Sequence, residues 1–147
     1  MTDATIRIAR PEEHPRVLAT YEAWGYGGGV QPEDRVYLAE SGAELVGIVR
    51  RTREHEVTML RGMQVAPEWR GRGIGWRLLR ALVAELGAEE CYCVPYSHLT
   101  GFYGGAGFVA IPEENAPPFL RPRMAGYRTR GLDVLVMRRP GSLEAGA

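Results

Sequence analysis

The sequence contains no lysine, and all 18 of its basic residues are arginine. Its acidic residues also number 18, so the formal net charge is zero and no overall field draws the chain to nucleic acid or an anionic membrane. The lack of lysine excludes a P-loop, which ends in Gly-Lys-Ser/Thr. Any anion site must therefore be local and must use arginine or main-chain N–H groups.

Long apolar runs and cysteines are also scarce. No stretch approaches the roughly 20 apolar residues of a membrane span, and no basic region precedes an apolar one at the N-terminus. We therefore expect a cytoplasmic protein without membrane contact. Cys91 and Cys93 share one face of an expected strand, where neighbouring cysteines are poorly placed for an unstrained disulfide. They are expected to be reduced thiols in the core.

The length of 147 residues suits one domain, which we expect to span residues 1–147. Hydrophobic periodicity predicts a mixed, mainly antiparallel sheet flanked by helices, which is an α/β fold. The expected elements are a strand and a helix before residue 25, three strands within 35–66, a helix over 75–86, a strand from 91, a short helix after 97, and strands at 108–111 and 132–139. The intervening proline-rich residues 112–131 are expected to form a functional flap.

The most informative segment is "QVAPEWRGRGIGWRLL", residues 64–79, in which a strand, a glycine-rich connection and a helix start follow one another. Unpaired N–H groups and the helix dipole make such a helix start an anion site. Gly71, Gly73 and Gly75 would let a phosphate touch the main chain because they have no Cβ.

Nearby side chains add charge and exclude a rival motif. Arg70, Arg72 and Arg77 would supply charge-assisted contacts to a ligand with several phosphate charges. The dinucleotide fingerprint does not fit, because it needs glycine where Trp76 stands.

The segment resembles the signature of the GNAT superfamily of acyl-CoA-dependent N-acetyltransferases, which reads Arg or Gln, two residues, Gly, one residue, then Gly or Ala. "GFYGGAGF", residues 101–108, resembles the aromatic helix and turn that follow the next strand in that family. The resemblance covers residues 57–111 and implies the GNAT fold, whose splayed parallel strand pair holds acyl-CoA.

The resemblance implies that the chain transfers an acetyl group from acetyl-CoA, its cosubstrate, to a primary amine of an unidentified acceptor by direct attack in a ternary complex. No metal is expected. The implied cofactor-binding residues are the main chain of Met63, Gln64 and Val65 and the loop residues Arg70, Gly71, Arg72, Gly73, Ile74, Gly75 and Trp76.

Two side chains are candidates for proton transfer. Tyr103 resembles the family tyrosine near the cofactor sulfur, and a phenol can protonate a thiolate of similar basicity; the alternative is a core aromatic role. His98 is the first candidate for the base, because imidazole exchanges protons near neutral pH. Glu22 and Glu56 are weaker candidates.

The sequence departs from the family pattern in two places. Arg61 lies on the strand where many relatives carry a glutamate, and Tyr96 stands where many carry an asparagine. The first departure keeps a non-catalytic acyl-CoA sensor open as an alternative. A hydrolase using Ser97 and a metal site using Cys91, Cys93 and His98 rank lower, because neither has a complete motif.

The acceptor and the oligomeric state remain open. Tyr21, Trp24, the glycine loop after them and the proline-rich flap are expected to shape an acceptor pocket. Glu113 and Glu114 could attract a cationic amine. Dimerisation is common among similar proteins, so a homodimer is an open alternative.

Overall fold

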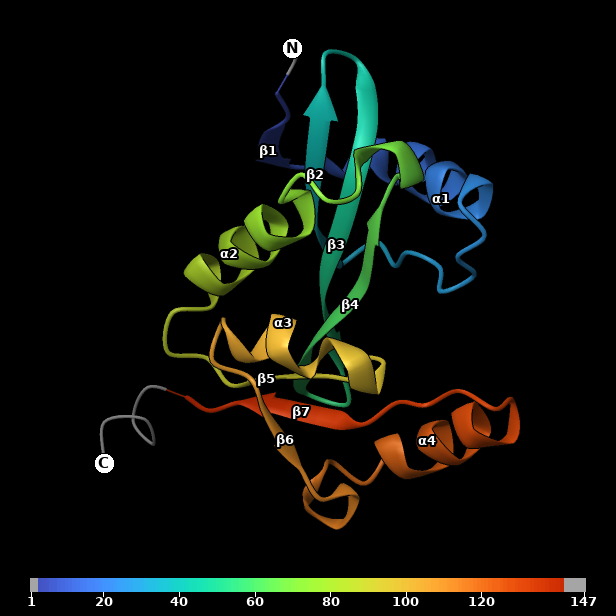
Figure 1. Ribbon diagram of the computed structural model, residues 1–147, viewed down its shortest axis with the longest axis vertical. Helices are drawn as coiled ribbons and strands as arrows, with labels where there is room; N and C mark the ends of the chain where they lie inside the picture. Colours follow the sequence, from blue (N-terminus) through green and yellow to red (C-terminus); the bar gives the residue numbers. More distant parts are fainter. Residues whose placement is uncertain (1–2, 142–147) are drawn as a thin grey trace. The chain divides into compact units, whose positions relative to one another are not determined.

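The computed structural model describes residues 3–141 and has an α/β fold (Figure 1). Its described strands form a seven-stranded sheet in the order β1-β2-β3-β4-β5-β7-β6. The strands are β1 (Thr5–Ile8), β2 (Arg35–Ser41), β3 (Glu44–Glu54), β4 (Val57–Val65), β5 (Cys91–Cys93), β6 (Val109–Ile111) and β7 (Val136–Arg139). The helices are α1 (His14–Ala23), α2 (Ile74–Leu86), α3 (Thr100–Gly104) and α4 (Leu120–Thr129), with short 3-10 turns η1 (Pro11–Glu13), η2 (Pro67–Trp69), η3 (Ser97–Leu99) and η4 (Glu113–Asn115).

The sheet is mixed, as the sequence predicts. The pairs β1–β2, β2–β3, β5–β7 and β6–β7 are antiparallel. The pair β4–β5 is parallel, with Met59 opposite Tyr92. A parallel pair next to antiparallel strands is the arrangement that the family resemblance implies.

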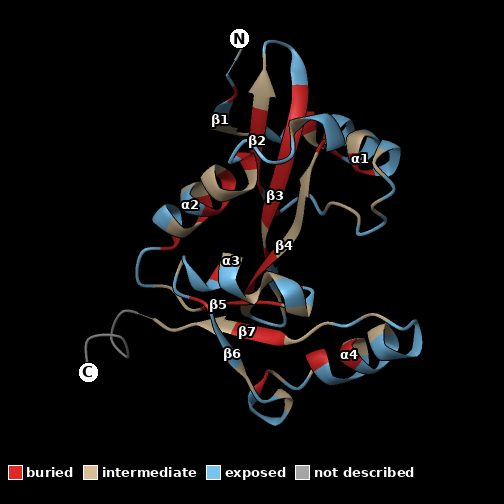
Figure 2. Cartoon of the chain, viewed as in Figure 1, coloured by how far each residue is buried: buried red, intermediate tan, exposed pale blue. Residues whose placement is uncertain are grey.

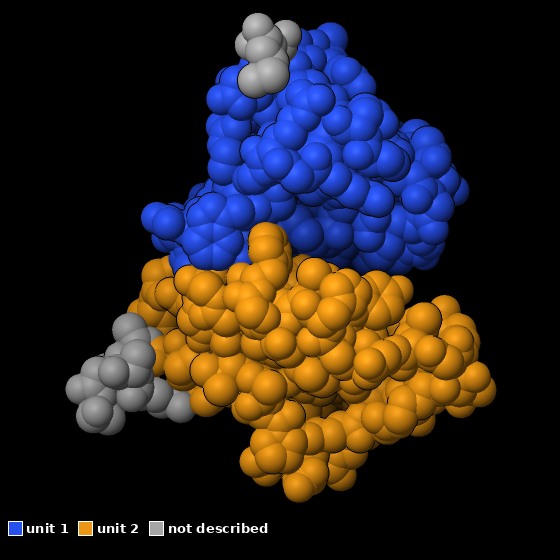
Figure 3. All heavy atoms as spheres, in the orientation of Figure 1, with its two compact units in different colours: residues 1–52, 60–85 blue, residues 53–59, 86–147 orange. Residues whose placement is uncertain are grey.

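The chain divides into two compact units, which are coloured separately in Figure 3. The first contains residues 1–52 and 60–85, and the second contains residues 53–59 and 86–147. Strand β4 contributes to both. That the whole chain acts as one domain stays a prediction.

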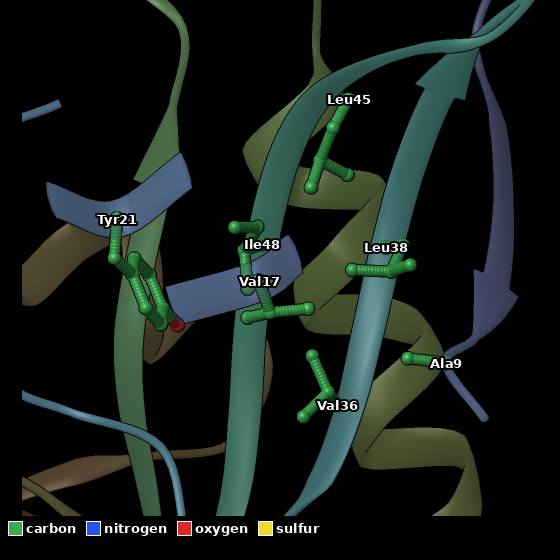
Figure 4. Close-up of a cluster of buried hydrophobic side chains, with 7 residues drawn as sticks. All are labelled: Ala9, Val17, Tyr21, Val36, Leu38, Leu45 and Ile48. Atoms are coloured by element: carbon green, nitrogen blue, oxygen red, sulfur yellow. The ribbon is translucent and has the colours of Figure 1, made fainter. Parts of the chain in front are cut away.

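In the first unit, α1 and α2 cover opposite faces of the strands. Val17 and Tyr21 of α1 join a buried cluster with residues of β2 and β3, including Ile48 (Figure 4). The neighbouring Gly47 faces the other way, and a Cβ there would lie only 2.9 Å from Ile74 Cγ2 and 2.9 Å from Leu78 Cδ1 of α2. Glycine at this position therefore lets α2 approach the sheet closely. The cluster on the α1 side consists of Ala9, Val17, Tyr21, Val36, Leu38, Leu45 and Ile48.

The buried residues of this unit follow the spacing of apolar side chains on its helices and include most of β3. Helix α2 buries Leu78, Leu79 and Leu82 at 0% exposure, as its apolar spacing predicts. Most of β3 is also buried (Figure 2). Leu18 of α1 is 39% exposed, because the buried face of the helix is formed by Val17 and Tyr21, four residues apart.

In the second unit, the segment expected to form a functional flap contains a helix. Helix α4 lies within the proline-rich residues 112–131, and its Leu120 and Met124 are buried four residues apart. Pro122 is compatible with this helix because it occupies the first turn, where the N–H groups have no intrahelical acceptor. The sequence analysis did not predict this helix, and the role of residues 112–131 as a flap stays a prediction. The core of this unit is formed by Met59, Tyr92, Ala116, Leu120, Met124 and Val136.

Candidate functional site

The glycine-rich connection before α2 is an exposed turn with two left-handed residues. Gly71 has φ +78° and Gly73 has φ +80°, and a Cβ at either position would meet no atom within 4 Å. Side chains other than glycine rarely adopt such backbone angles. These two glycines are therefore required by the path of the chain itself, and their exposed main chain is open to a ligand.

This turn ends at the N-terminus of α2. The carbonyl of Gly73 accepts the N–H of Arg77 at 3.0 Å, which marks Gly73 as the residue preceding the helix. The N–H groups of the first turn of a helix have no intrahelical acceptors, and the dipole of this 13-residue helix places partial positive charge there. Gly75 lies inside this first turn. The geometry suits an anion.

Three arginines surround the turn, and each has a contact. The Nε of Arg70 donates to the carbonyl of Val65 at 3.2 Å. The guanidinium of Arg72 lies over the Trp69 ring, 4.6 Å from its centroid. Arg77 forms a 3.2 Å ion pair with Asp3, both exposed. Because Arg70 and Arg72 are exposed and use few of their five N–H donors in these contacts, they can also bind an anion.

Strand β4 contains a third left-handed glycine. Gly62 has φ +69° in the middle of the strand, a conformation that disrupts regular pairing and is typical of a bulge. The predicted main-chain contacts, Met63, Gln64 and Val65, follow it and are half-buried. After them, the N–H of Ala66 returns to the carbonyl of Val46 at 2.8 Å.

A buried polar cluster supports this glycine. The Tyr21 hydroxyl donates to the Gly62 carbonyl at 2.8 Å. The Nε of Arg50 donates to Tyr21 Oη at 3.3 Å. Nη1 of Arg50 donates to the Asp34 carboxylate at 2.8 Å, and Nη2 donates to the Tyr26 hydroxyl at 3.2 Å.

The cluster contains a charged pair, Arg50 and Asp34, that is shielded from solvent. The side chains of Arg50 and Asp34 are 2% and 1% exposed. Burial opposes the charge of Arg50, but its contacts with Tyr21, Tyr26 and Asp34 outweigh this, so its pKa lies above the ordinary value. Burial raises the pKa of Tyr21, which therefore stays a neutral hydrogen-bond donor. Tyr21 does not line an open acceptor pocket, because it is fully buried.

Sequence reasoning missed Arg50, Asp34 and Tyr26. Their roles depend on partners 16 to 29 residues apart, which no spacing rule connects. Two signals were available in the sequence: Arg50 directly follows the apolar run of one expected strand, and Gly62 interrupts the next strand, "MLRGMQV".

Tyr103 lies in the second unit, on the short helix α3. It is 5% exposed, and its ring makes edge contacts with Phe102 at 4.9 Å and Phe108 at 6.1 Å between centroids. Tyr103 therefore packs among aromatic residues, as the alternative of a core aromatic role predicts. Its role as proton donor stays a prediction.

His98 is also in the second unit but lies at the surface of η3. Its ring stacks on Tyr96, with 5.9 Å between centroids and 18° between planes. The neighbouring Ser97 hydroxyl donates to the Asp133 carboxylate at 2.7 Å. His98 and Tyr103 thus lie on one unit, whereas the predicted cofactor residues 63–65 and 70–76 lie on the other.

The structure also locates the two cysteines and Glu113. Cys91 and Cys93 are buried thiols that form no disulfide, and the pKa of Cys93 is raised mainly by burial and further by its electrostatic interaction with Cys91. Glu113 is paired with Arg128 through contacts of 2.9 and 3.0 Å, so its carboxylate is already engaged. Within residues 3–141, no three His, Cys, Asp or Glu side chains are grouped to hold a metal ion. Over the same residues, no helix has the length and apolar character to cross a membrane.

Comparison with known proteins identifies a family. A model of the acetyltransferase (GNAT) domain matches residues 32–110, more than half of the 147-residue chain. The match includes the turn before α2 and the aromatic segment of α3. No curated protein matches the sequence significantly.

Solved structures share the fold. The acetyltransferase of the GNAT family from Streptococcus pneumoniae aligns with a TM-score of 0.67 and 17% identity, covering 92% of this chain and 98% of that chain. The GNAT-family acetyltransferase from Staphylococcus aureus Mu50 aligns with a TM-score of 0.64 and 16% identity, again covering 92% of this chain and 98% of that chain. N-acetylglutamate synthase from Neisseria gonorrhoeae, complexed with coenzyme A and N-acetyl-glutamate, aligns with a TM-score of 0.65 and 18% identity. This match covers 95% of this chain but only 35% of that chain.

Proposed function

The chain belongs to the GNAT acetyltransferase family, and we propose that it transfers an acetyl group from acetyl-CoA to a primary amine by direct attack in a ternary complex. The observation that carries this proposal is the turn before α2. Its two left-handed glycines leave main chain exposed at the N-terminus of a 13-residue helix, beside two exposed arginines.

This turn suits the pyrophosphate of acetyl-CoA. The helix start supplies N–H donors, and Arg70 and Arg72 supply charge against the phosphate groups. The main chain of Met63 to Val65 would bind the pantetheine arm, which contains amides able to pair with a strand. A similar structure, the N-acetylglutamate synthase from Neisseria gonorrhoeae, was solved with coenzyme A.

The reaction places distinct demands on the protein. The amine nitrogen attacks the thioester carbonyl, the C–S bond breaks, and the amine loses a proton as the amide forms. We assign stabilisation of the developing oxyanion to a main-chain N–H near Val65, and protonation of the departing CoA thiolate to the Tyr103 hydroxyl.

The acceptor must attack as a free base. An alkylamine with a pKa near 10.4 is uncharged in only about one molecule in 2,000 at pH 7, so forming the free base costs about 4–5 kcal/mol. His98 is the proposed acceptor of the released proton. Its exposure allows it to pass that proton to solvent.

A test of the proposal separates binding from turnover. Calorimetry with CoA measures binding, and CoA release from acetyl-CoA measures turnover with L-glutamate, an aminoglycoside, a peptide with a free N-terminus and a blocked peptide containing lysine. We expect micromolar CoA affinity and turnover with at least one amine. Tyr103→Phe should lower kcat at least about tenfold, whereas Tyr127→Phe on α4, a half-buried tyrosine, should not. Absence of CoA binding would refute the proposal.

A second candidate function is a non-catalytic acyl-CoA sensor. Arg61 favours it, because this cation stands on the strand where many relatives carry a glutamate. Tight CoA binding without turnover of any amine above the uncatalysed rate would support this function over catalysis.

A further inference from the structure

The left-handed residue in β4 is held by two independent constraints. Gly62 has φ +69°, and a Cβ at this position would lie 2.4 Å from Tyr21 Oη, 3.0 Å from Tyr21 Cζ and 3.1 Å from Arg50 Nε. Any larger residue would therefore be strained in its backbone and would also displace the tyrosine or the arginine. The strand, the tyrosine and the arginine are fitted to one another.

The chemistry of the donors fixes the direction of the hydrogen bonds. An arginine can only donate, so the Nε–H of Arg50 must point to Tyr21 Oη. The hydroxyl proton of Tyr21 is then committed to the Gly62 carbonyl, 2.8 Å away. The order of donation is Arg50 to Tyr21 to Gly62.

Fixing the Gly62 carbonyl also fixes the next N–H group. The carbonyl of Gly62 and the N–H of Met63 belong to one planar trans peptide and point in opposite directions. With the carbonyl held toward Tyr21, the Met63 N–H points away from it. Met63 is the first of the three residues whose main chain is proposed to contact the cofactor.

The anchor of this chain of bonds is rigid. Arg50 is 2% exposed and is held by the carboxylate of Asp34 at 2.8 Å. The same Asp34 oxygen accepts the main-chain N–H of Gln31 at 2.9 Å. The tyrosine ring is fixed as well, because Tyr21 packs against Tyr26 with 4.6 Å between ring centroids. A residue held on several sides can impose a conformation on its neighbour.

We propose that Arg50 and Tyr21 are positioning residues for acyl transfer: they fix the peptide between Gly62 and Met63, and with it the main-chain groups of residues 63–65 that hold the acetyl-CoA arm and its thioester. This inference rests on the proposed function. It assigns to Arg50 and Tyr21 a role in stabilising the transition state in addition to their role in folding, because misoriented main-chain donors stabilise an oxyanion poorly.

The test compares two buried tyrosines of the same unit. Tyr21→Phe removes the bond to Gly62 and keeps the ring. Tyr37→Phe is the matched control, because Tyr37 is 1% exposed and its hydroxyl donates to Glu85 at 2.5 Å, remote in sequence from β4. Both variants are assayed below their unfolding temperatures, with acetyl-CoA and whichever amine of the panel gives the fastest CoA release.

We expect Tyr21→Phe to lower kcat about tenfold or more while KM for acetyl-CoA changes less than about threefold, since a donor used mainly in the transition state affects kcat. Tyr37→Phe should keep the kcat of the wild-type protein. The double variant Arg50→Gln/Asp34→Asn, which keeps the pair neutral, should lower kcat similarly, and adding Tyr21→Phe to it should cause little further loss because both changes act through the same peptide.

Three results would overturn the inference. The first is wild-type kcat in Tyr21→Phe, and the second is an equal loss in Tyr37→Phe, which would indicate general destabilisation. The third is a fully multiplicative loss when Tyr21→Phe is combined with the double variant. These results require an active wild-type protein, so they differ from failure of the proposed function, in which the wild-type protein neither binds CoA nor releases it from acetyl-CoA; that outcome removes the inference too.

Discussion

Gly75 allows the ligand role of the turn to be separated from its structural role. Gly71 and Gly73 have left-handed backbone angles, so their glycines are explained without a ligand. Gly75 lies within helix α2, where glycine is unfavourable. Replacing it with alanine should raise the free energy of unfolding by about 0.5–1 kcal/mol, because alanine loses less backbone entropy in a helix. For a chain of this size, that corresponds to an increase in Tm of about 1–4 °C.

The same substitution should weaken the binding of CoA. If the pyrophosphate lies against the main chain of the first turn, the added methyl group would crowd it. Overpacking by one methyl group costs about 1–3 kcal/mol, so the Kd for CoA should rise about 5- to 150-fold. Stability and affinity are therefore expected to change in opposite directions, which a general packing defect would not produce.

Calorimetry and thermal unfolding of Gly75→Ala measure the two effects. Gly126→Ala is the matched control: Gly126 is an exposed residue of α4, and a Cβ there would meet no atom within 4 Å. It should gain stability by a similar amount and keep its CoA affinity. An unchanged Kd in Gly75→Ala would refute the close approach of a phosphate to this turn, whatever happened to Tm.

Three further predictions concern stability and use chemical denaturation. Glu56→Gly should stabilise the protein by about 1 kcal/mol, because Glu56 has φ 65° in the turn between β3 and β4, where glycine is not strained; a loss of stability would contradict this. The carboxylate of Glu13 accepts hydrogen bonds from Arg7, which lowers its pKa from 4.5 to about 2. The stabilising contribution of this ion pair to the free energy of unfolding should be complete above pH 4.5 and disappear as the pH falls toward 2. Glu13→Gln should therefore flatten this part of the plot of unfolding free energy against pH, and an unaltered plot would argue against the pair. Leu78→Ala should cost about 2–5 kcal/mol, because Leu78 is 0% exposed between α2 and β3; a loss below about 1 kcal/mol would show that the site collapses around the cavity.

The elements that could be predicted are those whose signals are local. The apolar spacing of α2 and the glycine-rich turn before it occupy adjacent residues, so one short window contains both the helix and its start. The alternation over residues 35–66 likewise predicts β2, β3 and β4. Helix α4 was not predicted within the proline-rich residues 112–131; it tolerates Pro122 because this residue occupies the first turn, where proline costs little.

Parts of the site that depend on distant partners could not be predicted. Arg50 looks like the polar end of a buried strand, and nothing adjacent to it indicates Asp34 or Tyr21 as its partners. Only the paired strands and α1 bring these side chains together, so their roles follow from tertiary structure alone.

Four glycines near the proposed site have different physical causes, and this distinction decides which of them reports on a ligand. Gly62 is required by its backbone angle and by contact with Tyr21. Gly71 and Gly73 are required by their backbone angles alone. Gly75 has no such backbone requirement, because it lies in a helix that alanine would favour. A motif of spaced glycines therefore does not establish phosphate binding by itself; the glycine that the fold does not require is the one whose replacement tests for the ligand.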